Sequence, residues 1–148
     1  MPGTDLTLPR GGRVRASASY HRAEHDPDRD WGLYLDPHWL PTWPSRIIEW
    51  ENLGLPVDFD DAVDAIQESY RIISDGGLVE VGCQAGIGRT GTVIACYTIL
   101  DGIAADQAVA WVRSTYLVRA VETPVQEWWV EWFGAAVNGT TPPRRPGR

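Results

Sequence analysis

The stretch from Asp58 to Asp75 alternates apolar and polar positions with the period of an α-helix. Acidic and amide side chains separate its apolar residues, which recur every three or four positions and would share one face: Phe59, Val63, Ile66, Tyr70 and Ile73. Asp58 is a residue type favoured at helix N-termini, and Gly76-Gly77 would end the helix. We therefore predict an amphipathic helix with one buried face.

Shorter apolar runs predict strands and three further helices. Residues 6–8 and 14–16 flank a turn-rich connection and indicate a hairpin, and the other predicted strands cover residues 31–35, 46–50 and 78–81. The further helices are predicted over about 89–100, over about 104–116 and from Thr123 onward. Strands and helices in this order predict an α/β fold, a small central sheet flanked by helices.

The same pattern predicts how the chain is divided. We expect residues 1–30 to form an N-terminal hairpin and loop extension and residues 31–137 to form the main domain. Residues 138–148, rich in Pro, Gly and Thr, are expected to be a disordered tail. The total of 148 residues is enough for one domain with a sizeable core.

Charge narrows the classes of partner. The chain has 20 Asp and Glu against 13 basic residues, all of them Arg, for a net charge of -7. The acid excess lies between residues 49 and 143 and opposes binding to nucleic acid or to an anionic membrane. No apolar run is long enough to span a bilayer and the N-terminus does not resemble a signal peptide, so we expect a cytoplasmic protein.

Metal and disulfide chemistry find little support in the sequence. Two cysteines make no disulfide scaffold, and no Cys/His cluster has zinc spacing. His21 and His25, with Asp26 and Asp28 nearby, lie in a stretch without helical periodicity, which favours a solvated loop over a metal site. Cys96 falls in the apolar helix and is predicted to be a core thiol. We expect no metal and no organic cofactor.

The strongest chemical signal is a glycine-rich turn between the strand over 78–81 and the next helix. Its residues are Cys83, Gln84, Ala85, Gly86, Ile87, Gly88 and Arg89. Such a turn points backbone N–H groups at one spot and forms an anion site, to which Arg89 adds a fork matched to phosphate. Beside these groups Cys83 is expected to favour the thiolate and to act as a nucleophile. Thr90 can donate its hydroxyl to the sulfur and help it leave a phosphocysteine.

The run from Cys83 to Gly91 resembles the phosphate loop of the cysteine-dependent protein tyrosine phosphatases, and the resemblance covers roughly residues 31–135. Residues 50–56 resemble the family's mobile Trp-Pro-Asp loop, and residues 122–126 resemble the segment with its water-orienting Gln, here Gln126. The length is similar to that of the small dual-specificity members. The resemblance implies hydrolysis of phosphate monoesters, in a phosphotyrosine protein or a small aryl phosphate, through a phosphocysteine intermediate.

Two departures from the family pattern affect the expected chemistry. Gly82 stands where the family usually has the His that orders the loop, although Cys83 is still expected to be largely a thiolate near neutral pH. Asn52 stands where the family has its general-acid Asp, and an amide cannot donate the required proton. General acid–base help is worth about 10² to 10⁴ in rate, so a slow enzyme is expected. Glu51 could supply the proton instead, with the further candidates Asp36, Asp58 and Asp60.

Several alternatives stay open at this level. Gln126 follows Thr123 and Pro124 at the spacing of a helix capping box, so helix initiation explains it as well as water orientation does. The protein could also be a catalytically disabled module that binds phosphate or phosphotyrosine. A sulfurtransferase or an arsenate reductase is disfavoured by the Gly-Arg-Thr-Gly ending of the loop.

A cluster of aromatic residues in the last predicted helix has two possible explanations. It could form a nucleic-acid stacking platform, but Glu127 and Glu131 interleave it and favour core packing for Trp128, Trp129, Trp132 and Phe133.

Overall fold

A computed structural model describes residues 4–18, 29–37 and 41–146 and confirms the predicted α/β class. Its five-stranded sheet has the order β1-β2-β5-β3-β4. The strands are β1 (Thr4–Thr7), β2 (Arg13–Ala18), β3 (Trp31–Tyr34), β4 (Ser45–Ile47) and β5 (Leu78–Cys83). The helices are α1 (Phe59–Ser74), α2 (Gly88–Leu100), α3 (Ala105–Thr115) and α4 (Pro124–Asn138).

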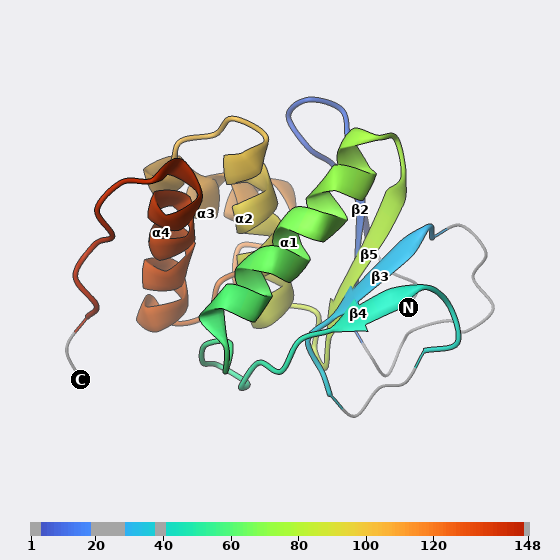
Figure 1. The fold of residues 1–148 in the computed structure, drawn as a ribbon, viewed down its shortest axis with the longest axis horizontal. Helices are drawn as coiled ribbons and strands as arrows, with labels where there is room; N and C mark the ends of the chain where they lie inside the picture. Colours follow the sequence, from blue (N-terminus) through green and yellow to red (C-terminus); the bar gives the residue numbers. More distant parts are fainter. Residues whose placement is uncertain (1–3, 19–28, 38–40, 147–148) are drawn as a thin grey trace.

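The helices gather on one side of the sheet (Figure 1). α1 contacts β3 and β5, α2 contacts β5 and β2, and α3 and α4 pack against α2. β5 lies at the centre, parallel to both β2 and β3, and every residue of it is buried. Ligands bind to sheets of this kind outside the carboxyl ends of the parallel strands. Cys83, the last residue of β5, lies at that edge.

The boundaries of α1 follow from its sequence as predicted. The Asp58 carboxylate accepts a hydrogen bond from the Asp61 amide (3.0 Å) and so caps the first turn. Arg71 lies in the last turn, where a positive charge favours the helix dipole, and Gly76 follows with a left-handed φ of 95°.

The N-terminal hairpin belongs to the same sheet as the rest of the chain. β1 pairs antiparallel with β2, and β2 pairs along its whole length with β5. The turn of the hairpin is tied to the end of α2, because the Asp101 carboxylate accepts hydrogen bonds from the Arg10 amide (2.7 Å) and the Tyr70 hydroxyl (2.5 Å). Residues from both strands are buried in the core, so the predicted extension and the predicted domain share one hydrophobic interior.

The aromatic residues of α4 are mostly core, as predicted. Trp129 and Phe133 are fully buried, and Trp129 packs edge-on against Trp50 with ring centroids 5.1 Å apart. Trp132 stacks on Trp129 (5.7 Å) and contacts Phe59 of α1 (4.9 Å). These contacts join α1, α4 and the segment before α1, and they account for the aromatic cluster without a nucleic acid.

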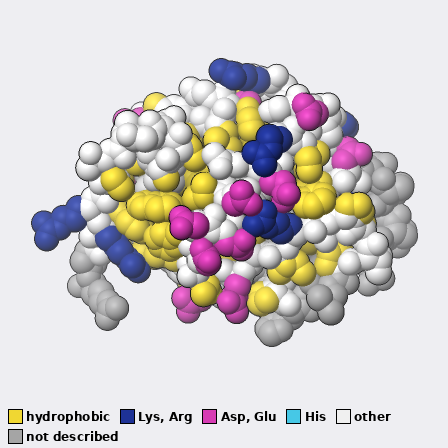
Figure 2. Space-filling view, viewed as in Figure 1, with side chains coloured by type: hydrophobic (Ala, Val, Ile, Leu, Met, Phe, Trp, Pro, Cys, Tyr) yellow, Lys and Arg dark blue, Asp and Glu magenta, His cyan; other side chains and the backbone are white. Residues whose placement is uncertain are grey.

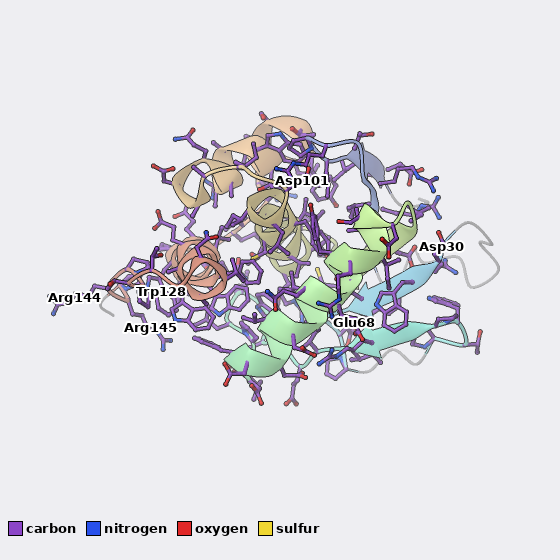
Figure 3. The ribbon with its side chains drawn as sticks, turned by 45° about the horizontal axis from the view of Figure 1, so that its top comes forward. Asp30, Glu68, Asp101, Trp128, Arg144 and Arg145 are labelled. Carbon is purple, nitrogen blue, oxygen red and sulfur yellow. The ribbon has the colours of Figure 1, made fainter. Side chains whose placement is uncertain are left out.

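The C-terminal segment follows α4 as coil, and the part described makes two contacts with Trp128. The Trp128 indole donates a hydrogen bond to the Pro143 carbonyl (2.9 Å), and the Arg145 guanidinium lies over the Trp128 ring at 5.6 Å (Figure 3). A left-handed Gly139 (φ 69°) turns the chain out of the helix.

The structure contradicts the predicted end of one strand and confirms the predicted burial of Cys96. The predicted strand over 46–50 is too long, because β4 ends at Ile47 and Trp50 only bridges Pro56 across a tight loop. Cys96 is fully buried, as predicted, and burial raises the pKa of its thiol well above the usual value. His21, His25, Asp26 and Asp28 lie outside the described residues.

Two properties concern membranes and metals. None of the described helices combines the length and the apolar character needed to cross a bilayer. The described part of the chain also contains no group of three or more His, Cys, Asp or Glu side chains placed to hold a metal ion.

Candidate active site

The turn between β5 and α2 presents backbone N–H groups at a helix start. α2 begins at Gly88, and no side chain caps its N-terminus, which leaves its first amides available to an anion. Gly86 has a φ of 72°, and a Cβ atom there would lie 2.9 Å from the Ser17 carbonyl oxygen. Glycine is therefore required at position 86 both for backbone conformation and for the close approach of β2.

The Cys83 sulfur is buried beneath this turn and accepts two hydrogen bonds. The Gly86 amide lies 3.2 Å from Sγ and the Thr90 hydroxyl 3.0 Å from it. Only 2% of the Cys83 residue is exposed. Hydrogen bonds from both donors favour negative charge on the sulfur. The one from Thr90 is the contact that the sequence predicts.

Arg89 is held in place from one side of its guanidinium group. Its Nη1 donates to the carbonyl oxygens of Leu35 (2.9 Å) and Trp50 (2.8 Å). Its Nε is buried and has no hydrogen-bond partner among the described residues, while only 6% of the residue is exposed. A buried charged donor without a partner is costly, and an oxyanion bound at this turn would satisfy it.

Tyr116 supports the turn from the far side, a role that the sequence pattern did not indicate. Its hydroxyl donates a short hydrogen bond to the Gly86 carbonyl. Burial, together with the nearby Cys83, raises the pKa of Tyr116 to about 12, so the hydroxyl keeps its proton over the physiological range. The two residues are 30 positions apart, and nothing local in the sequence connects them.

The loop over residues 50–56 is clamped to the start of α4. The Gly54 carbonyl accepts hydrogen bonds from the Trp50 indole (2.9 Å) and the Gln126 amide (3.2 Å), and the Thr123 hydroxyl donates to the Leu53 carbonyl (3.1 Å). Leu53 has a positive φ of 61°, an uncommon conformation for a residue with a side chain. These bonds hold the loop in one geometry.

A cavity of about 430 Å³ opens between this loop and the phosphate-loop turn. Its described lining combines acidic, amide and apolar groups around Arg89: Asp36, Pro37, Glu49, Trp50, Glu51, Asn52, Val57 and Gln84. The structure thus brings Asn52, Glu51 and Asp36 to one cavity. The other two acid candidates are absent from the described lining: Asp58 caps α1, and Asp60 is exposed in its first turn.

Comparison with known proteins agrees with this geometry. Residues 56–103 match the family described as "Polymorphic toxin system, DSP-PTPase phosphatase". An uncharacterized protein of Methanocaldococcus jannaschii is 36% identical over 107 residues, which are 64% of this chain and 69% of that protein. Human dual specificity protein phosphatase CDC14C is 41% identical over 59 residues, 38% of this chain and 13% of its own length. This chain belongs to the DSP-PTPase family of cysteine-dependent phosphatases.

Solved structures confirm the phosphatase fold. The crystal structure of kinase associated phosphatase, with its catalytic cysteine replaced by serine, covers 94% of this chain and 97% of its own with a TM-score of 0.76 at 14% identity. Tk-PTP in its active form covers 80% of this chain and 88% of its own with a TM-score of 0.66 at 22% identity. At these identities the likeness concerns the fold alone.

Gln126, which the phosphatase pattern predicts to orient water, uses its side chain in protein contacts. It is fully buried, its Oε1 accepts from the Glu122 amide (2.9 Å), and its Nε2 donates to Gly54. Its own amide donates to the Thr123 hydroxyl (3.3 Å), as a capping motif requires. The capping contact is present, and the water-orienting role stays a prediction for this member of the DSP-PTPase family.

The loss of the usual His at Gly82 is accompanied by other support for the loop. Besides Tyr116, the Glu122 side chain packs against Gly88, where a Cβ atom would lie 2.4 Å from Oε1. Residues after α3 and before α4 thus contact the loop at Gly86 and at Gly88.

Proposed function

We propose that this DSP-PTPase hydrolyses phosphate monoesters in two steps through a phosphocysteine on Cys83. The observation that carries the proposal is the buried pair of complementary groups at one turn. Cys83 Sγ accepts two hydrogen bonds, and Arg89 keeps an unpartnered, buried Nε beside an uncapped helix start. This arrangement matches a thiolate nucleophile placed below a bound phosphoryl group.

In the first step the Cys83 thiolate attacks phosphorus. The S–P bond forms while the bond from phosphorus to the ester oxygen breaks, and the leaving oxygen takes a proton. Backbone amides of residues 84–89 and the Arg89 guanidinium hold the equatorial oxygens, whose charge is spread in a loose transition state. The hydrogen bonds from Arg89 to Leu35 and Trp50 support this role, because they fix its orientation before substrate arrives.

In the second step water attacks the phosphocysteine. Phosphate leaves with the new P–O bond, and the sulfur departs as a thiolate that the Thr90 hydroxyl and the Gly86 amide stabilise. A base must take one proton from the attacking water. Gln126 contributes by holding Gly54, and hence the loop over 50–56, against the cavity. Both steps use only water and groups of this chain.

The proton in each step is proposed to pass through a carboxylate of the cavity. Asn52 occupies the position of the family's Asp and cannot transfer a proton, so turnover is expected to be slow. Glu51 lies next to it on the same loop, and Asp36 lines the same cavity. We assign the role to Glu51 because the loop over 50–56 is the element that carries the acid in this family.

The expected substrates are phosphotyrosine in a protein or a small aryl phosphate. Trp50, Pro37 and Val57 give the cavity an apolar wall that suits an aromatic leaving group. An aryl oxide is also a better leaving group than an alkoxide, so it depends less on a strong general acid.

The decisive experiment follows release of p-nitrophenol from p-nitrophenyl phosphate by the wild type, Cys83→Ser and the matched control Cys96→Ala. Steady turnover in the wild type and in the control, lost by at least 10³-fold in Cys83→Ser, is expected for a cysteine nucleophile. Mass spectrometry of the wild type quenched in alkali, in which the S–P bond is stable, should find one phosphate on Cys83. Equal rates in all three proteins would contradict the proposal.

A second candidate function is a disabled module that binds phosphotyrosine without useful turnover, and Asn52 is the observation that favours it. This alternative predicts a stoichiometric burst of p-nitrophenol and a persistent phosphocysteine. Absence of phosphate or tungstate binding would contradict both functions.

A further inference from the structure

The mouth of the candidate active site is acidic while its floor is basic. Glu49 and Glu51 are exposed on the loop side of the cavity, and Asp36 is half-buried across from the turn. Arg89 is the basic residue among the described residues that line the cavity. A phosphate monoester bound at Arg89 would therefore have carboxylates around its leaving group.

Arg89, at the inner end of the cavity, indicates an anion site, and this evidence is independent of the acidic rim. Arg89 is more than nine-tenths buried, and its Nε lacks a partner within the described part of the chain. Its hydrogen bonds within the described residues go to backbone carbonyl oxygens, which leave its charge uncompensated. The cavity therefore has a built oxyanion site at one end and an acidic surface at the other.

The described cations nearby form no ion pair with Glu49 or Glu51. Arg46, close in sequence to Glu49, forms ion pairs with three acids of α1: Asp61 (2.6 Å), Asp64 (2.9 Å) and Glu68 (3.1 Å). Figure 2 shows acidic side chains gathered over α1 on this face of the molecule. Among the described residues, neither Glu49 nor Glu51 has an ion-pair partner, so no described cation covers either carboxyl group.

We propose that this rim selects phosphate monoesters with positive charge beside the phosphate, and specifically phosphotyrosine flanked by Arg or Lys. The inference rests on the proposed function, since it concerns the substrate of the same site. A long basic side chain next to the phosphotyrosine is attracted by the exposed Glu49 carboxylate, whereas an acidic neighbour is repelled. The same rim disfavours ligands with several phosphates.

The test compares two phosphotyrosine peptides that differ only in their flanking residues, Arg on both sides or Glu on both sides. At low ionic strength we expect kcat/KM to favour the Arg peptide by about tenfold, as for two or three exposed charge pairs. The ratio should approach one in 1 M salt, where the screening length falls to about 3 Å. Glu49→Gln should lower the ratio by about threefold, and Glu49→Lys should lower it further.

Glu131→Gln is the matched control, because it removes an exposed carboxylate of α4 that does not line the cavity. It should leave the ratio unchanged. A ratio of one in the wild type, with hydrolysis still dependent on Cys83, would overturn the preference and leave the proposed function intact.

Binding separates the preference from turnover. The dissociation constants of both peptides are measured on the Cys83→Ser protein by fluorescence anisotropy. Tighter binding of the Arg peptide supports the inference even if the wild type turns over neither peptide, an outcome that would count against the phosphatase activity alone. Equal affinities, or no binding of either peptide, would overturn the preference.

Discussion

At the residue scale, the proposed slow turnover depends on one amide, Asn52. Asn52 and Glu51 both line the cavity, but only Glu51 can donate a proton to a leaving oxygen or accept one from water. The hydrogen bonds of Cys83 and Arg89 involve neither the Asn52 nor the Glu51 side chain: Cys83 accepts from Gly86 and Thr90, and Arg89 donates to the carbonyls of Leu35 and Trp50. Binding and covalent attack can therefore persist while protonation limits turnover.

Asn52→Asp is expected to raise the turnover rate. Restoring a carboxylic acid at the family position should increase kcat for a phosphotyrosine peptide by about 10²-fold, the lower end of general acid catalysis. The effect should be smaller for p-nitrophenyl phosphate, whose leaving group hardly needs a proton. Steady-state kinetics measure both, with Asn138→Asp at the end of α4 as a control that adds the same charge far along the chain from the loop.

The predicted gain means that Glu51 is a less effective proton donor than an Asp at position 52, and an unchanged kcat in Asn52→Asp would mean that Glu51 supplies the proton equally well. In that case Glu51→Gln should abolish the alkaline limb of the pH profile of kcat/KM, which separates an acid from a residue that only shapes the loop.

At the element scale, the start of α4 positions the loop that carries these residues. Leu53 and Val121 both have a φ of 61°, and such strained residues cost about 1–3 kcal/mol each. The Arg113 guanidinium donates to the Val121 carbonyl (2.7 Å), and the Thr123 hydroxyl donates to the Leu53 carbonyl. Thr123 at the start of α4 thus holds Leu53, and Arg113 of α3 holds Val121.

Thr123→Val is expected to weaken this clamp. It removes the cap that accepts from the Gln126 amide and the bond to Leu53, and it should lower the free energy of unfolding by about 1 kcal/mol. The Tm should fall by about 2–5 °C, and kcat should fall while the remaining turnover still depends on Cys83.

Thr140→Val, in the exposed coil after α4, is the control for the loss of a Thr hydroxyl and should leave both Tm and kcat unchanged. Equal effects of the two substitutions on Tm would show that the Thr123 contacts contribute nothing to stability.

At the scale of the whole molecule, burial favours the protonated, uncharged form of three tyrosine side chains. Burial raises the pKa of Tyr97, Tyr70 and Tyr116, of which Tyr116 reaches about 12. A group with a raised folded pKa stabilises the fold fully below its unfolded value and loses that contribution as pH rises through the folded value. Alkaline pH should therefore unfold this protein.

The free energy of unfolding is expected to fall between about pH 10, the ordinary pKa of Tyr, and pH 12. In Tyr116→Phe the loss of unfolding free energy over this pH range should be smaller by about 1 kcal/mol. The figure is kept low because Tyr116 is partly exposed. Urea unfolding at pH 8, 10 and 11 measures the free energy of unfolding of the wild type and of Tyr116→Phe. An equal decline with pH in the two proteins would contradict the role of Tyr116. At pH 7 the variant should lose the bond to Gly86, so the rate of iodoacetamide labelling of Cys83 should also change.

The sequence by itself determined the features that depend on local order along the chain. The α1 period with its Asp58 cap, the strand-turn-helix around Cys83 to Arg89 and the burial of Cys96 all follow from neighbouring residues, and all appear in the structure. Helix caps, glycine turns and apolar periodicity act over a few residues, so their signals are complete within short segments.

Only the tertiary structure decided how that turn is completed. The carbonyl oxygens of Leu35 and Trp50 that orient Arg89 lie 54 and 39 residues before it, and Tyr116 reaches Gly86 across 30 residues. The end of the strand predicted over 46–50 was likewise set by a bridge to Pro56. Such contacts depend on which segments the packed sheet and helices bring together, and no short-range pattern records that choice.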